Sequence, residues 1–121
     1  MAYHQDWFMR QIRQFIEAVA RVLLGKDLRA EQPASSQWKE LEELLNRRGA
    51  CKAEDFLLDR FDPADRSWLE AGLALYSRLN DLTDQELEEQ NFSREEIREG
   101  IRNLCSMAGA PDMELLFGES S

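Results

Sequence analysis

The sequence is poor in the residue types that usually carry catalysis, metal binding and cross-linking. Histidine occurs once, at His4, and cysteine twice, at Cys51 and Cys105. A zinc site needs several closely spaced ligands, and a disulfide framework needs more cysteines than these two. Glycine-rich phosphate loops, calcium-loop patterns and Glu-x-x-His pairs are also missing. We therefore expect a protein that is not an enzyme and that holds no metal or cofactor.

Long apolar runs are also absent. The longest candidate, residues 15–24, is interrupted by Glu17 and Arg21, so it falls short of the ~20 uncharged residues of a membrane span and does not resemble a signal-peptide core. The net charge of −9 repels phosphate backbones, so we do not expect nucleic-acid binding or stable membrane insertion. We expect a cytoplasmic protein whose cysteines remain thiols.

Strand-type alternation is missing, and only six glycines and three prolines interrupt the 121 residues. This composition predicts an all-α fold with about five or six helices packed as hairpins in one domain, residues 1–121. We divide it into an N-terminal helix at 1–26, a linker at 27–36 and an acidic helical body at 37–117. Packing of the tetratricopeptide type is one form of such hairpins, although the repeat motif itself matches poorly.

The first 26 residues have a charge balance of their own. They carry a net charge of +2, against −11 for residues 27–121. At about 100° per residue, residues 7–24 form an amphipathic helix whose basic residues lie opposite an apolar stripe. That stripe comprises Phe8, Ile12, Phe15, Ile16, Val19, Val22 and Leu23. Most such helices belong to the core of their own domain, while docking on a partner and self-association remain open.

Turn and capping residues predict the limits of the next helices. Ser35 or Ser36 is suited to cap a helix that ends at Gly49, and a shorter helix follows at 52–61. Asp62 followed by Pro63 then predicts the start of a central helix that extends to residue 82. Its broad apolar face includes a glycine, Gly72, where another backbone is expected to approach closely.

Two capping boxes predict the remaining helices. In each box a hydroxyl residue precedes a glutamate by three positions, so that the two side chains satisfy free backbone N–H groups. Thr83 with Glu86 predicts a short helix at 84–90, and Ser93 with Glu96 a longer one at 94–108. A last apolar turn is expected at 112–117. The acidic clusters of both helices are interpreted as solvated faces.

The sequence leaves three hypotheses for function. The leading one is a non-enzymatic module that binds a protein partner, or a second copy of itself, through the first helix. The residues assigned to this contact are Trp7, Phe8, Ile12, Ile16 and Leu24. Trp7 and Leu24 lie off the apolar stripe, and an exposed tryptophan is a good anchor for a partner.

The second hypothesis is a regulatory domain that binds a small molecule in a pocket lined by Trp38, Trp68 and Tyr76. The third is a thiol redox sensor. Cys51 is flanked by basic residues at the expected start of a helix, which would favour its thiolate. Cys105 lies on an apolar face and is assigned to core packing.

The opening segment Gln5-Asp6-Trp7-Phe8-Met9-Arg10-Gln11-Ile12 resembles the start of a family of small bacterial helical proteins classed as a domain of unknown function. In that family a Gln-Asp-x-x-Met-Arg-x-Ile pattern opens an amphipathic helix, and hairpin-like helices follow. The resemblance implies an all-helical fold, with tetratricopeptide-like packing as one form of it. It implies no activity, and no functional residue is carried over from it.

Overall fold

The computed structural model describes residues 2–25 and 33–110, with side chains from residue 7 onward. These residues form six α-helices and one π-helical turn, and no strand occurs among them. The helices are α1 (Ala2–Val19), η1 (Ala20–Leu24), α2 (Ser36–Arg48), α3 (Ala50–Arg60), α4 (Arg66–Asn80), α5 (Asp84–Glu89) and α6 (Arg94–Met107). The predicted all-α single domain is confirmed. The apolar turn expected at 112–117 lies outside the described residues.

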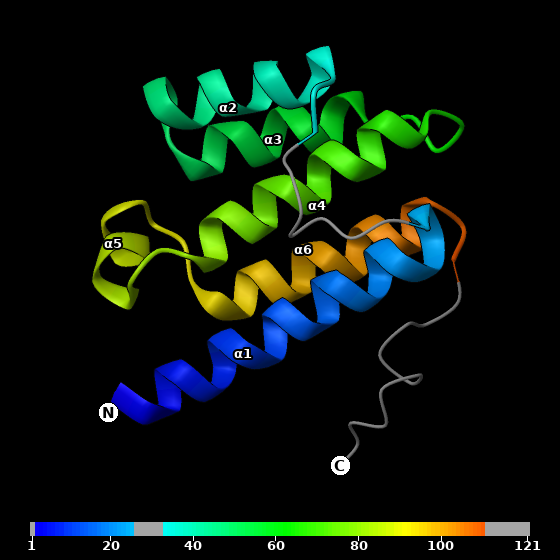
Figure 1. Cartoon of the computed structure of the whole chain (residues 1–121). Coiled ribbons are helices and arrows are strands. Elements are labelled where there is room, and N and C mark those ends of the chain that lie inside the picture. Colours follow the sequence, from blue (N-terminus) through cyan, green and yellow to red (C-terminus); the bar gives the residue numbers. More distant parts are fainter. Residues whose placement is uncertain (1, 26–32, 111–121) are drawn as a thin grey trace.

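Helix α4 lies at the centre of the molecule. It contacts α1, η1, α2, α3 and α6. Helices α2 and α3 form an antiparallel hairpin on one side of it, while α6 and α1 lie on the other, and the short α5 stands at one end (Figure 1). Helix α1 therefore packs against its own domain, and α2 and α1 form opposite edges of the bundle.

Several predicted helix ends are confirmed. The Ser35 hydroxyl accepts a hydrogen bond from the Trp38 amide, and Gly49 ends α2 with a φ of 97°. Thr83 and Glu86 form the complete reciprocal capping box, and Ser93 accepts from the Glu96 amide at the start of α6. Local side-chain chemistry thus sets these boundaries, because it satisfies backbone groups that the helices leave free.

The predicted start of the central helix at Asp62 and Pro63 is wrong. Helix α4 begins at Arg66, and its cap is Asp65, whose Oδ1 accepts from the Ser67 amide. Asp62 instead closes a turn, since its Oδ1 accepts from the Ala64 amide and its carbonyl accepts from the Asp65 amide. Two aspartates compete for the same capping role, and the second one takes it.

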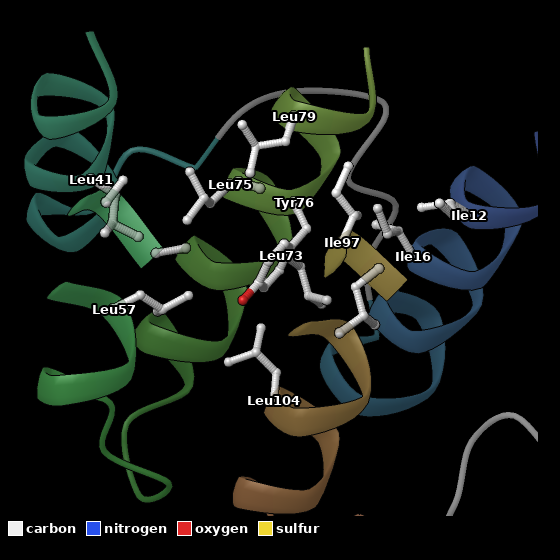
Figure 2. Close-up of a cluster of buried hydrophobic side chains, with 14 of the residues drawn as sticks. Ile12, Ile16, Leu41, Leu57, Leu73, Leu75, Tyr76, Leu79, Ile97 and Leu104 are labelled. Carbon is white, nitrogen blue, oxygen red and sulfur yellow. The ribbon is translucent and has the colours of Figure 1, made fainter. Parts of the chain in front are cut away.

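Two glycines let α6 lie close to α4. A methyl group added at Gly72 would stand 2.6 Å from a Leu104 methyl carbon, and one added at Gly100 would overlap the Tyr76 ring. A close contact is therefore present at Gly72, but the side chains of Leu104 and Leu57 make it and not the expected backbone; the contact at Gly100 was not predicted. Figure 2 shows Tyr76 between the α3 side of the core, with Leu57, and the α6 side, with Ile97 and Leu104.

The first helix ends in a π turn, which changes which residues face the core. From Ala20 the wider turn rotates the chain by less than an α-helix does per residue. Val22, placed on the buried stripe by regular helical spacing, is consequently 60% exposed. Leu23 and Leu24 are partly buried against the core instead. Gly25 closes the turn in the left-handed conformation, with its N–H directed to the Ala20 and Arg21 carbonyls.

Candidate functional site

The solvent-facing side of α1 and η1 is the part of the molecule where an exposed aromatic residue meets basic residues. Trp7 is 58% exposed, and its ring centroid lies 6.5 Å from that of the half-buried Phe8. We call the outer face of α1 the set of exposed side chains Trp7, Arg10, Gln14, Arg21 and Val22. Among residues 7–25, three arginines stand against one glutamate, so this surface is basic on a protein of net charge −9.

The opposite side of α1 fixes this face in place. Ile12 and Ile16 are 1% and 3% exposed and pack beside Ile97 of α6 (Figure 2). The burial of several aliphatic side chains contributes about 1.5–3 kcal/mol for each one fully removed from water. Arg13 adds a long ion pair of 3.9 Å to Asp81. Both partners are largely exposed, so this pair contributes little.

A buried polar network also ties α1 to the body. Asn80, 2% exposed at the end of α4, donates from Nδ2 to the Met9 carbonyl at 2.9 Å. Its Oδ1 accepts from Arg94 Nη1 at 3.0 Å. Arg94, also buried, further donates to the carbonyls of Asn80 and Leu82 and to Asp84 Oδ1. Every described partner is polar and well placed, which is the condition for burying a charge at moderate cost.

The far end of the first helix is capped by a side chain from α4. Arg66 donates from Nη2 to the Leu23 carbonyl, one of the acceptors that a helix end leaves free. The same end carries the π turn, which places Leu24 partly against the core. The first helix is therefore held to the rest of the domain by specific contacts at Met9 and at its C-terminal end.

Of the residues that the sequence assigns to a partner contact, some are exposed in the structure and others are buried in the core. Trp7 is exposed and Phe8 half-buried, whereas Ile12 and Ile16 lie in the core of the protein itself. Leu24 faces the core because of the π turn. Partner contact by Ile12, Ile16 and Leu24 would require α1 to leave the body, and it stays a prediction. The sequence did not assign the exposed Arg10 and Arg21 to this contact, although their spacing along the helix places them on one face with Trp7.

Cys51 does not have the basic surroundings that the redox hypothesis requires. Partial burial raises the pKa of its thiol, and the nearby carboxylates of Glu96, Glu54 and Asp55 raise it further. Lys52 lowers the pKa, but this effect is the smallest of those present. The raised pKa contradicts the expected thiolate at Cys51, because Glu54 and Asp55 follow it on α3 and folding adds Glu96 of α6. Cys105 is buried, in agreement with its core assignment.

A buried phenol and a half-buried carboxyl group meet between α3 and α4. Tyr76 is fully buried, and its hydroxyl donates to Glu54 Oε2 at 2.6 Å. Burial raises the pKa of Glu54, the hydrogen bond from Tyr76 lowers it, and Glu96 and Asp55 raise it further. Burial, followed by the Glu54 charge and hydrogen bond, raises the pKa of Tyr76. The pair joins two helices, and sequence spacing gave no signal of it.

The three aromatic residues proposed to line a ligand pocket are occupied by contacts within the fold. Trp38 is 2% exposed, and the Arg78 guanidinium lies 5.6 Å from its ring centroid. Tyr76 is bound to Glu54, and the Trp68 ring centroid lies 6.2 Å from that of Phe56. They are thus packing residues here. The sequence could not separate the two roles, because aromatic residues suit both a core and a pocket.

A surface hollow of about 330 Å³ lies instead along the outer side of α2, where α2 meets α3. Half-buried Leu44 and Phe56 form its apolar part. Charged side chains from one stripe of α2 surround them, namely Glu40, Glu43, Arg47 and Arg48. Sequence reasoning missed this feature, although the charge order of α2 was visible.

A protein-family model described as "Family of unknown function (DUF6483)" matches residues 2–109. No curated protein and no solved structure matches the chain. None of the helices within residues 2–25 and 33–110 is both long and apolar enough to traverse a bilayer. The match confirms the expected membership of a family of unknown function and covers nearly the whole chain.

Proposed function

The chain belongs to this family of unknown function, and we propose that it is a non-enzymatic helical module that binds an acidic segment of a protein partner through the outer face of α1. The observation that carries the proposal is Trp7, 58% exposed, on a basic surface of an acidic protein. Large exposed aromatic residues with neighbouring arginines are the composition of binding hot spots.

The support of α1 by the body favours binding without a large rearrangement. The core face buries Ile12 and Ile16, and Asn80 and Arg66 hold the carbonyls of Met9 and Leu23. A surface that is already ordered loses less conformational entropy when a partner binds. The function therefore does not require α1 to detach from α4 and α6.

The positive charge of the outer face of α1 indicates an acidic partner. Arg10 of α1 and Arg21 of η1 stand eleven positions apart, which is about 16 Å along the axis at the α-helical rise. An amphipathic partner helix with two acidic positions at this spacing, and an apolar patch beyond the one that meets Arg10, matches this arrangement. The apolar patch would meet Trp7 and Phe8. The proposed setting is the cytoplasm, which the unpaired thiols of Cys51 and Cys105 support.

The test combines capture from an extract of the source cells with a defined peptide probe. Trp7→Ala and the pair Arg10→Glu, Arg21→Glu should each abolish capture of the same protein by the full chain. Lys39→Glu, an exposed charge reversal on α2, should leave capture intact. Circular dichroism melting must show that all variants are folded.

The peptide arm gives the chemistry of the contact. A helical Leu/Glu peptide should bind the native chain more tightly than its Leu/Lys counterpart, and its affinity should fall as salt rises, because screening weakens exposed charge pairs. Equal binding of both peptides, or capture that survives Trp7→Ala, contradicts the proposal. Loss of capture with Lys39→Glu as well would assign the effect to net charge and not to this face.

A further inference from the structure

The charge order along the exposed stripe of α2 is self-complementary. Leu44 lies at its centre, Glu40 four residues before it and Arg48 four residues after it. When two copies of such a helix lie antiparallel around a twofold axis through Leu44, Glu40 of each copy faces Arg48 of the other. This reciprocity is the defining property of an isologous dimer interface.

The residues at the two ends of this stripe have unused charges. Arg47 pairs with Glu43 of the same helix at 3.2 Å, with both side chains mostly exposed. Within the described residues, Glu40 and Arg48 form no ion pair and no side-chain hydrogen bond. A second copy would supply both missing partners at once, by the same symmetry operation.

The hollow beside the stripe gives the contact its apolar part. Leu44 and Phe56 are half-buried and lie in a hollow of about 330 Å³. A Leu44 side chain from a second copy, placed at the twofold axis, would fill space next to these two residues. An apolar centre with charged residues around it is the usual anatomy of a protein interface.

We propose that the outer side of α2 is a homodimer interface, with Leu44 at the twofold axis and two reciprocal Glu40–Arg48 ion pairs. The contact is confined to a helix of 13 residues, about 20 Å long, so the dimer is weak and reversible. Helix α2 and α1 form opposite edges of the bundle (Figure 1). In the dimer, the outer face of α1 therefore remains exposed in each copy. The proposed dimer does not depend on the proposed partner binding.

Charge exchange tests this geometry directly. Sedimentation equilibrium of the full chain, up to concentrations on the order of 1 mM, detects even a dimer with a millimolar dissociation constant. Glu40→Arg alone and Arg48→Glu alone each replace two attractive pairs by two repulsive ones and should weaken dimerisation about tenfold or more. The double variant Glu40→Arg, Arg48→Glu should restore it, as should an equimolar mixture of the two single variants.

Controls separate this interface from other modes of association. Lys39→Glu lies on α2 outside the stripe and should leave the dissociation constant unchanged. Leu44→Cys, in a Cys51→Ser background, should oxidise to a covalent dimer because the two positions meet at the axis. Melting curves must show that the variants are folded.

A chain that stays monomeric at millimolar concentration and yields no cross-linked dimer overturns the proposal. It is also overturned by a dimer that both single charge reversals leave unchanged, since that dimer uses another surface. Failure to restore the dimer in the double variant would reject the antiparallel pairing. Trp7→Ala should have no effect on dimerisation, so the result does not depend on the role of α1.

Discussion

Tyr76→Phe should show how much one hydrogen bond between α3 and α4 contributes to stability. The free-energy cost of the substitution should depend on pH. The substitution keeps the ring, which fills the space beside Gly100, and removes only the hydroxyl that donates to Glu54 Oε2 at 2.6 Å. Cavity formation is therefore small, and the loss comes from the hydrogen bond.

The size of the loss follows from the charge on the acceptor. A hydrogen bond to a charged group contributes about 1.5–3 kcal/mol, and one between neutral groups about 0.5–1.5 kcal/mol. Glu54 is neutral below its raised pKa and ionised above it. We therefore expect Tyr76→Phe to cost about 2 kcal/mol at pH 8, which is roughly 5–10 °C in Tm for a domain of this size, and about 1 kcal/mol near pH 4.

Linkage gives the sign of the pH dependence. The pKa of Glu54 in the folded protein lies above its ordinary value of 4.5. Its favourable contribution is thus fully present below pH 4.5 and is lost as the pH rises through the folded-state pKa. The Tyr76 hydrogen bond is the one effect that lowers this pKa. Its removal raises the pKa further, so the variant loses more stability than the native chain over the same rise in pH.

The assay is urea unfolding followed by circular dichroism at several pH values between about 4 and 8, with midpoints converted to free energies at constant m. Glu54→Gln is the matched control. Its amide oxygen still accepts from Tyr76, but it does not titrate, so Tyr76→Phe in that background should cost the same at every pH. A cost that is equal at pH 4 and pH 8 in the native background would refute the reasoning.

Four further predictions concern packing, polar contacts and thiol chemistry. Gly100→Ala should destabilise the fold by about 1–3 kcal/mol in urea unfolding, since the new methyl group overlaps the Tyr76 ring, whereas Gly72→Ala should cost less because it meets the flexible end of a leucine. Asn80→Ala should cost about 1–3 kcal/mol and speed amide hydrogen exchange in α1, and unchanged exchange would show that the contact to Met9 does not hold the helix. Alkylation of Cys51 at pH 7.5 should be slower than that of a free cysteine and faster after Glu96→Gln, since this charge raises the thiol pKa. Above pH 10, stability should fall more steeply in the native chain than in Tyr76→Phe, because the folded-state pKa of Tyr76 lies above its ordinary value of 10.0.

Local signals in the sequence predict much of this fold. Ser35, Gly49 and Thr83 act within a few residues of themselves, and their roles depend on side-chain chemistry that any helix of this kind would use. Local sequence signals do not decide between Asp62 and Asp65 as the cap of α4, because an aspartate at either position could accept the capping hydrogen bond. The packing of the folded helix decides which of the two aspartates becomes the cap.

Contacts between distant residues leave weaker signals. The Asn80 side chain reaches the Met9 carbonyl across 71 positions, and Tyr76 reaches Glu54 across 22. The residue types and their spacing along α4 do not indicate which distant group each side chain would reach. Only part of the Cys51 environment shows the same limit: Glu54 and Asp55 follow Cys51 closely in sequence, whereas Glu96 of α6 is brought near it by folding.

The π turn at the end of the first helix is a feature of the candidate site that regular helical spacing does not predict. Regular spacing placed Val22 in the core and Leu24 outside it, and one wider turn exchanges their roles. Val22 consequently joins Trp7, Arg10 and Arg21 on the outer face of α1. If this exchange extends the partner surface, Val22→Ser should weaken capture of the partner without lowering the Tm. Leu24→Ser should lower the Tm, because Leu24 packs partly against the core. The opposite pattern would mean that the first helix continues as an ordinary α-helix, and that the surface ends near Arg21.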